Sequence, residues 1–208
     1  ISADGQFIAF IGTASNLIPG KDTNATPDVF LFDATTGTLA LVSLAASSPI
    51  QTANGESRVA TRPQSSVSAD GRYTVFSSTA TDLLPDQLDN NAGYDVFLYD
   101  RVLNTRKLVS HLPGLPSVTG SSSSDSPSIS ADGRFVVFQS QATNLVAGTD
   151  GNSATDIFLY DVLAGTVKLV SHLPGAPGTA ANSASRAPVI SADGKTVAFV
   201  SYANNLVS

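Results

Sequence analysis

The sequence predicts an all-β protein, a β-propeller built from four-stranded antiparallel blades. One phrase, Ser-Ala-Asp-Gly, returns four times, so the chain is a tandem array of units of roughly sixty residues. Each unit contains short β-branched and aromatic runs bounded by turn residues, without a helical period between them. The four copies of the phrase occupy residues 2–5, 68–71, 130–133 and 191–194.

The array forms one repetitive body rather than several unlike domains. Its repeats cover approximately residues 1–66, 67–128 and 129–189, and a partial fourth covers 190–208. Three units and part of a fourth leave blade faces open, whereas propellers close with four to eight blades. The chain begins inside a repeat phrase and contains no methionine. We therefore expect a segment of a larger propeller, and the alternative is that copies of the chain complete one another.

The first strand of each unit follows the Asp-Gly of the phrase. Asp-Gly is a tight-turn signal, because glycine takes the φ > 0 position at no steric cost. The runs that follow are residues 7–11, 73–77, 135–139 and 196–200. They carry four phenylalanines that we expect in equivalent buried positions: Phe10, Phe76, Phe138 and Phe199.

The second and third strands form a hairpin. The second is residues 28–33, 95–100 and 156–161, and the third is residues 39–43, 106–110 and 167–171. The loops between them end in Gly37, Asn104 and Gly165, residue types that tolerate the left-handed conformation of a bulged hairpin loop. A second matching set of buried side chains is expected at Phe30, Phe97 and Phe158.

The fourth strand must precede the next Ser-Ala-Asp-Gly phrase, with candidates at residues 65–67, 127–129 and 188–190. Polar stretches rich in Ser, Pro, Gly and Asn come before these strands, at 45–56, 120–126 and 175–185. Their composition predicts surface loops.

The phrase and the strand after it resemble the WD40-like (PD40, TolB-type) propeller repeat over essentially the whole chain. The resemblance rests on Ser-Ala-Asp-Gly-Arg-Phe-Val-Val-Phe followed by Asp-Ile-Phe-Leu-Tyr-Asp. It implies a propeller fold, in particular the longer repeats of large secreted or surface proteins of bacteria. The chain departs from the family's pattern in lacking Trp before the turn and in exceeding the common length of about 40 residues. Alanine also replaces the family's proline, at Ala3, Ala69, Ala131 and Ala192.

A metal site is the sharpest chemical hypothesis. Before each second strand the pattern Asp-x-Asn-x-x-x-Asp recurs at fixed spacing. Alternating carboxylate and amide oxygens closed by a further carboxylate suit a hard cation such as Ca²⁺. The alternative is that these side chains cap the turn by accepting hydrogen bonds from nearby backbone amides. The candidate ligands are Asp22, Asn24 and Asp28; Asp89, Asn91 and Asp95; and Asp150, Asn152 and Asp156.

No catalytic residues are predicted. His111 and His172 stand at the same place in successive units, and no residue set unique to one unit suggests a nucleophile with its base. The aspartates of the repeated phrase are interpreted as turn-formers rather than general acids. They are Asp4, Asp70, Asp132 and Asp193.

The composition of the chain disfavours several classes of binding partner. A net charge of −6 disfavours a nucleic-acid groove, and no apolar run approaches the roughly 18 residues that span a membrane. The absence of cysteine excludes disulfides and thiolate metal sites. We therefore expect a non-enzymatic scaffold or binding module for protein or glycan partners, secreted, at the cell surface or periplasmic, with Ca²⁺ as the one expected cofactor. The alternative is the propeller portion of a secreted hydrolase or lyase whose catalysis is supplied elsewhere.

Overall fold

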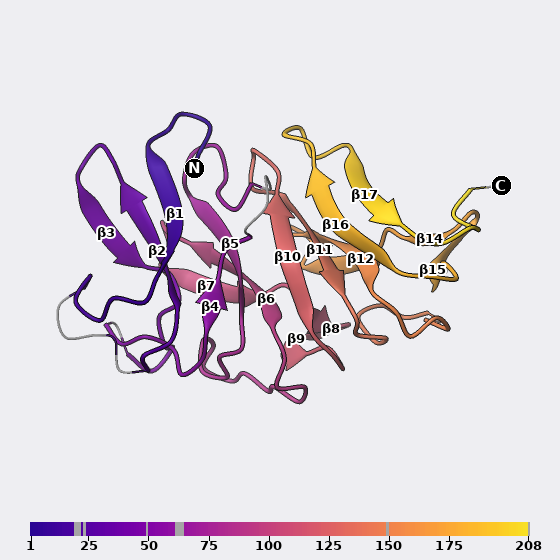
Figure 1. Cartoon of the computed structure of the whole chain (residues 1–208), viewed down its shortest axis with the longest axis horizontal. Helices are drawn as coiled ribbons and strands as arrows, with labels where there is room; N and C mark the ends of the chain where they lie inside the picture. The colour runs from indigo at the N-terminus through magenta and orange to yellow at the C-terminus, as the bar shows by residue number, and fades with distance from the viewer. Residues whose placement is uncertain (19–21, 23, 49, 61–64, 149, 208) are drawn as a thin grey trace.

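The computed structural model describes residues 1–18, 22, 24–48, 50–60, 65–148 and 150–207. These residues form strands, turns and irregular segments, and no helix among them is long and apolar enough to cross a membrane. Figure 1 shows the strands gathered into blades that follow one another along the long axis in chain order. The strands are β1 (Phe7–Gly12), β2 (Asp28–Asp33), β3 (Thr38–Leu41), β4 (Ser57–Arg58), β5 (Tyr73–Ser78), β6 (Asp95–Asp100), β7 (Thr105–Leu108), β8 (His111–Leu112), β9 (Leu115–Thr119), β10 (Ser124–Ile129), β11 (Phe135–Ser140), β12 (Asp156–Asp161), β13 (Thr166–Leu169), β14 (His172–Leu173), β15 (Ala176–Ala180), β16 (Ser185–Ile190) and β17 (Val197–Ser201).

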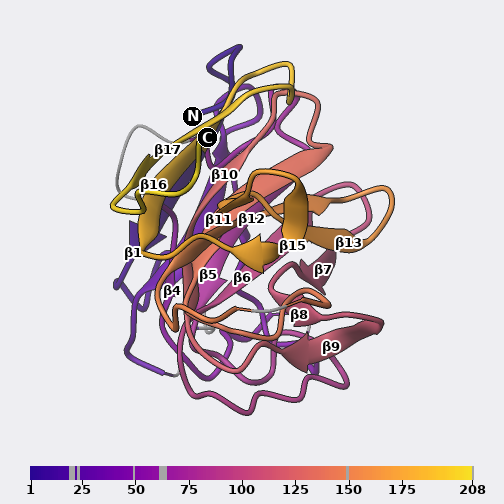
Figure 2. The same cartoon turned by 90° about the vertical axis from the view of Figure 1, so that its right-hand side faces the viewer.

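The predicted four-stranded antiparallel blade is confirmed. The second blade has the strand order β4-β5-β6-β7 and the third has the order β10-β11-β12-β13. The first blade contains β1-β2-β3, and the last contains β16-β17. Each four-stranded blade takes its first strand from the segment before a Ser-Ala-Asp-Gly phrase and its other three from the segment after it. Two hairpins, β8-β9 and β14-β15, follow the outer strands of the second and third blades (Figure 2).

Consecutive blades pack face to face. The strand β10 lies against β5 of the preceding blade, and β16 lies against β11. One core cluster joins Leu31 of the first blade to Phe97 of the second, and another joins Leu98 of the second blade to Phe138 of the third. Both faces of the second blade are therefore covered, which explains why every residue of β6 is buried.

The two phenylalanine sets meet in register, as equivalent positions should. In the first three blades a phenylalanine of one strand stands opposite a phenylalanine of the next, with ring centroids 5.6, 5.6 and 5.7 Å apart. The pairs are Phe10 with Phe30, Phe76 with Phe97, and Phe138 with Phe158.

The prediction that all four phenylalanines of the first-strand set are buried is wrong. Phe76 and Phe138 are 0% exposed, but Phe10 and Phe199 are only half-buried. Phe76 and Phe138 pack against the preceding blade, and the described residues contain no blade before Phe10. The last sheet consists of β16 and β17, so Phe199 lacks the opposite strand that carries a phenylalanine in the other blades.

The repeated aspartates form turns, as predicted. In the second unit Ser68 Oγ donates to Asp70 Oδ1 at 2.6 Å and accepts from the Tyr73 amide at 2.9 Å. Gly71 adopts a φ of 67°, which a side chain would disfavour. The same serine-to-aspartate bond recurs at residues 2, 130 and 191.

The alanine of the repeated phrase has a structural role. The Ala69 amide donates to the Ala131 carbonyl at 2.8 Å, and the Ala131 amide donates to the Ala192 carbonyl at 2.9 Å. These bonds link the turns of successive units. Because proline has no N–H, it could not donate this bond.

The prediction that the polar stretches are surface loops is wrong for two of the three. Residues 175–185 contain β15 and the first residue of β16, and residues 120–126 contain the start of β10. Buried serines form part of the blades here. Ser124 Oγ donates to Ser140 Oγ at 2.8 Å, and both residues are at most 2% exposed. The hydroxyls satisfy each other, so a polar sequence forms a buried strand.

Candidate functional site

Three acidic loops lie where the sequence places them, directly before β2, β6 and β12. The last aspartate of each pattern is the first residue of its strand and is fully buried: Asp28, Asp95 and Asp156 are 1%, 1% and 0% exposed. A buried carboxylate is costly unless hydrogen bonds or a positive charge compensate it.

The first aspartate of each loop caps the turn. Asp89 Oδ1 accepts from the amides of Asn91 at 3.0 Å and Ala92 at 3.2 Å. Ala92 adopts a φ of 53°, so the chain reverses direction at this residue. Asp22 and Asp150 accept the equivalent asparagine amides at 3.2 Å. One carboxylate oxygen of each first aspartate thus accepts the backbone hydrogen bond that the capping interpretation expects.

The asparagines hold the loop to the following segment. Asn91 Oδ1 accepts from the Gly93 amide at 2.6 Å, and its Nδ2 donates to the Gly120 carbonyl at 2.8 Å. Nδ2 also lies 3.4 Å from Asp95 Oδ2. Asn24 and Asn152 donate in the same way to the carbonyls of Ala53 and Ala181, each at 2.6 Å.

A serine from the third-strand motif supports each buried aspartate. Ser110 Oγ donates to Asp95 Oδ1 at 2.9 Å and accepts from the Val96 amide at 3.0 Å. Ser43 and Ser171 donate likewise to Asp28 and Asp156, at 2.7 and 2.6 Å. Sequence analysis missed these serines, although Leu-Val-Ser recurs in all three units.

The loops remain electrostatically uncompensated. Burial raises the pKa of Asp28 to about 7 and that of Asp95 to about 8, against the lowering effect of the serine bonds. The charge of the first aspartate of the loop raises both further. Burial raises the pKa of Asp156 in the same direction. One buried carboxylate oxygen per loop has no hydrogen-bond partner among the described residues: Asp28 Oδ2, Asp89 Oδ2 and Asp150 Oδ2. Leaving a buried charged acceptor unpaired costs more than about 1–3 kcal/mol.

Each loop therefore brings an asparagine and two aspartates of the pattern together, and the three loops stay separate. Within the described ranges, three His, Cys, Asp or Glu side chains do not come together as a metal-binding group. A cation held by one loop would therefore take its further ligands from carbonyl groups, the asparagine side chain or water.

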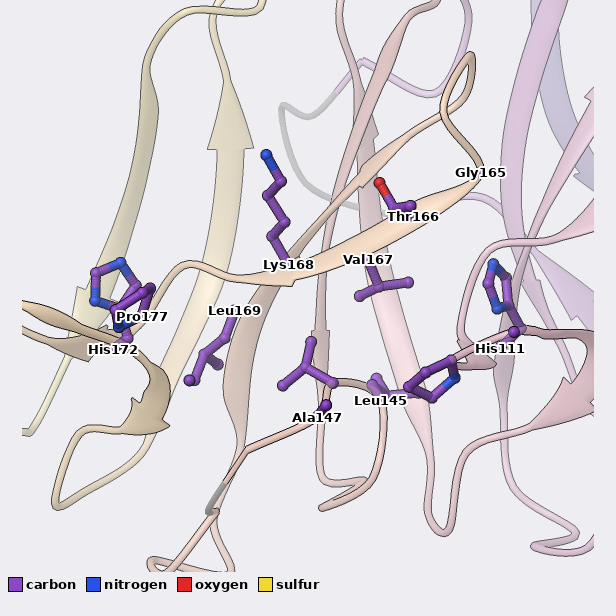
Figure 3. Close-up of a pocket in the computed structure, with 14 residues that line it drawn as sticks. His111, Leu145, Ala147, Gly165, Thr166, Val167, Lys168, Leu169, His172 and Pro177 are labelled. Atoms are coloured by element: carbon purple, nitrogen blue, oxygen red, sulfur yellow. The ribbon is translucent and has the colours of Figure 1, made fainter.

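A groove that sequence analysis did not predict lies beside β13, the outermost strand of the third blade (Figure 3). It has a volume of about 610 Å³, and we call it the β13 groove. Leu145, Val167 and Leu169 contribute apolar lining, while His111 and His172 stand at opposite ends. Its walls come from hairpins β8-β9 and β14-β15 and from the loop after β11.

One difference between the third unit and the second lies directly beside the β13 groove. Arg106 of β7 stands opposite Tyr99, and its counterpart Val167 of β13 stands opposite Tyr160. The Arg106 guanidinium covers the Tyr99 ring at 5.0 Å, and Nε donates to the Val42 carbonyl at 2.8 Å.

In the second unit this arginine therefore occupies part of the equivalent space. A smaller hollow of about 260 Å³, lined by Leu44, Tyr99 and Asn104, lies there. The signal in the sequence was a valine aligned with an arginine, which is visible only once the repeats are superimposed.

The two histidines hold the groove's ends in shape. His111 Nδ1 forms a hydrogen bond with the Leu112 carbonyl at 2.7 Å. The His111 and Tyr160 rings pack edge to face, with their centroids 5.7 Å apart. His172 Nδ1 bonds to the Leu173 carbonyl at 2.8 Å. Their equivalent backbone bonds agree with the interpretation that both are repeated structural residues.

These features define an antiparallel β-propeller segment with a groove that is larger in the third unit than at the equivalent place in the second. In structure the chain is similar to a protein described as TolB from Agrobacterium tumefaciens, with a TM-score of 0.56 and 20% identity, covering 98% of this chain and 53% of that one. It is also similar to TolB from Acinetobacter baumannii, with a TM-score of 0.51 and 18% identity over 97% of this chain and 36% of that one. The tricorn protease matches with a TM-score of 0.51 and 15% identity, over 95% of this chain and 14% of that one.

No protein-family model matches the sequence, and no curated protein matches it. The solved structures confirm the TolB-type propeller fold, which the resemblance of the repeat phrase implied. The chain spans about half or less of the length of each of these structures and is thus a partial propeller.

Proposed function

We propose that this chain is part of a non-enzymatic propeller that binds a protein partner, and that the β13 groove receives an extended segment of it. The observation that carries the proposal is that the groove has a volume of about 610 Å³ in the third unit, whereas the hollow at the equivalent place in the second unit has about 260 Å³. The repeats share their strands, turns and acidic loops because each must fold in the same way. A difference that replaces a half-buried, hydrogen-bonded arginine with valine and leaves an open apolar space is not required by the fold.

The groove's chemistry suits binding better than catalysis. His111 is 4% exposed and bonded to the backbone, so it is poorly placed to exchange protons with a substrate. The other ionisable residues that line the groove are Lys168 and His172. This set contains no carboxylate to orient a histidine as a base.

Charge and shape together favour one occupant, an extended peptide segment with apolar side chains and a carboxylate. The chain carries a net charge of −6, yet the ionisable lining residues His111, Lys168 and His172 are all of the basic type. β13 is the outermost strand of its sheet, so an extended segment beside it could add main-chain hydrogen bonds. A glycan would need more polar partners than this largely apolar lining offers.

The test is to fill the groove with the residue that the second unit uses. Val167→Arg places a guanidinium opposite Tyr160, as Arg106 lies opposite Tyr99. Peptides of eight residues that combine apolar positions with Asp or Glu, displayed on phage, would be selected on the wild-type chain. We expect the enriched peptides to lose at least tenfold in affinity for Val167→Arg, which is about 1.4 kcal/mol.

The matched control is Leu163→Arg, which adds the same charge at a side chain that is 82% exposed and does not line the groove. It should bind the peptides with wild-type affinity. Equal binding to Val167→Arg and the wild type would refute the groove as the site. Enrichment of glycans on an array, with no peptide enriched, would favour the glycan alternative.

We further propose a periplasmic or extracellular location. The support is the oxygen-rich chemistry of the three acidic loops, because weak calcium sites of extracellular modules work at about 10⁻⁴–10⁻³ M. Immunoblots of cell fractions from the native host should find the protein outside the cytoplasm, and a cytoplasmic pool alone would contradict the proposal.

A further inference from the structure

We propose that each of the three acidic loops binds one Ca²⁺ ion between its first and last aspartates. This goes beyond the binding role of the β13 groove, whose lining residues do not include the loop aspartates. The ion would stabilise the blades rather than take part in recognition.

Unpartnered buried oxygens provide the first argument. Asp28 is 1% exposed, and its Oδ2 has no partner among the described residues. Asp89 Oδ2 and Asp150 Oδ2 are enclosed in the same way. A buried anionic oxygen without a donor is what a bound cation would satisfy.

The second argument is the missing counter-charge. The four ion pairs among the described residues are made by other carboxylates: Asp125, Asp100, Asp161 and Asp193. Within the described ranges, neither aspartate of a loop is paired with a lysine or arginine. The same arrangement recurs in three units at one place in the fold, before the second strand of each blade.

The third argument is the oxygen set around the loop asparagine. In the second unit Asn91 Nδ2 lies 2.8 Å from the Gly120 carbonyl, 3.4 Å from the Ser122 carbonyl and 3.4 Å from Asp95 Oδ2. Carboxylate, amide and carbonyl oxygens together with water are the usual ligands of Ca²⁺.

Calcium fits this ligand set better than other ions. The loops contain no cysteine or histidine, which disfavours zinc and copper. Mg²⁺ demands a near-ideal octahedron and gives up its water reluctantly, whereas Ca²⁺ accepts irregular sets of six to eight oxygens. Gly120 is the residue directly after β9. An ion bound to its carbonyl would therefore connect the acidic loop to hairpin β8-β9 of the same unit.

The test is calorimetric titration of the 208-residue chain with CaCl₂ after EDTA treatment and dialysis. We expect three ions per chain, and a melting temperature that rises with calcium because the ion binds the folded state. Asp89→Asn should reduce the stoichiometry to two. This variant keeps an oxygen that can accept from the amides of Asn91 and Ala92 while removing the carboxylate charge.

Asp86→Asn is the matched control, since it makes the same change at an exposed aspartate outside the loops. It should still bind three ions. Circular dichroism in EDTA should show that both variants are folded, and if Asp89→Asn is not, Asp150→Asn takes its place with the same expected loss of one ion.

Terbium luminescence provides a separate readout for the second loop. Tyr94 lies next to Asp95, whereas Pro27 and Thr155 stand at that position in the other loops. Tb³⁺ emission excited through tyrosine should be displaced by Ca²⁺ and should fall strongly in Tyr94→Phe, whose stoichiometry should stay at three. The proposal is overturned if the wild type shows no heat of binding and no change in melting temperature at 10 mM CaCl₂, a concentration about tenfold above weak extracellular sites. It is equally overturned if Asp89→Asn keeps all three ions.

Discussion

Truncating Phe76 tests whether packing between blades holds the array together. Phe76 is 0% exposed and stacks on Phe97 at 5.6 Å, with an angle of 25° between the rings. Phe76→Ala should lower the free energy of unfolding by about 3–5 kcal/mol, the usual cost of emptying a fully buried phenylalanine site. The cost combines lost transfer free energy with the cavity that the rigid sheets leave behind.

Phe10→Ala is the matched comparison, because Phe10 stacks on Phe30 at the same 5.6 Å with an angle of 22°. Phe10 is only half-buried, so its removal exposes less apolar surface and leaves a more open site. We expect a cost of about 2 kcal/mol, from roughly half the transfer term and little cavity. The difference between the two variants isolates the contribution of the neighbouring blade, since chemistry and stacking are alike.

The assay is urea denaturation of each variant, followed by circular dichroism and by tyrosine fluorescence, with the free energy taken by linear extrapolation. Equal losses for Phe76→Ala and Phe10→Ala would refute the reasoning, because burial between blades would then contribute nothing beyond the stacked pair.

Three further predictions follow from single contacts. Ser110→Ala should cost about 2–4 kcal/mol in urea denaturation, because it leaves the buried Asp95 carboxylate and the Val96 amide without their shared partner; Ser47→Ala, at an exposed serine, should change little. Gly71→Ala should lower the melting temperature more than Gly37→Ala. Both have positive φ, but a Cβ at Gly71 would overlap the Phe7 ring whereas nothing lies within 4 Å at Gly37. The hydrogen bond from Ser130 and that from the Arg134 amide lower the pKa of Asp132 from its ordinary value of 3.8. Its contribution to stability should be complete above the unfolded pKa and lost as the pH falls through the lower folded pKa. Ser130→Ala should weaken this dependence in urea melts between pH 2 and pH 6, and an unchanged profile would contradict it.

The repeat and its strands could be predicted from the sequence because they depend on local chemistry. Asp-Gly turns, β-branched runs and left-handed positions at Gly37, Asn104 and Gly165 act within a few residues of themselves. Their recurrence then implied blades that cover one another. The two sets of equivalent phenylalanines were predicted as well, but the pairing of Phe76 with Phe97 was shown only by the structure, because the long segment 79–94 joins their strands.

The buried serine strands could not be predicted in the same way. Ser124 looks like a loop residue until the structure sets Ser140 beside it at hydrogen-bond distance. Polar composition indicates exposure only when the polar groups lack partners within the fold, and those partners come from another strand.

The acidic loops stand between the two cases. Their aspartates and asparagines were identifiable from spacing, and so was the choice between a metal and a capped turn. Only the tertiary structure showed that Asn91 reaches the Gly120 carbonyl and that Ser110 supports Asp95. It also showed that one carboxylate oxygen per loop is buried without a donor among the residues that the structure describes.

The sequence by itself determined the repeat, the strands and the turns, because each depends on contacts within a single unit. The β13 groove was decided by the tertiary structure alone. Arg106 covers Tyr99 and reaches the Val42 carbonyl, a group contributed by the preceding unit. Val167 is too short to fill the equivalent space. This space between two units therefore stays open as the β13 groove. Side-chain length acts there across a gap between segments more than sixty residues apart, as the separation of 64 positions between Arg106 and Val42 shows.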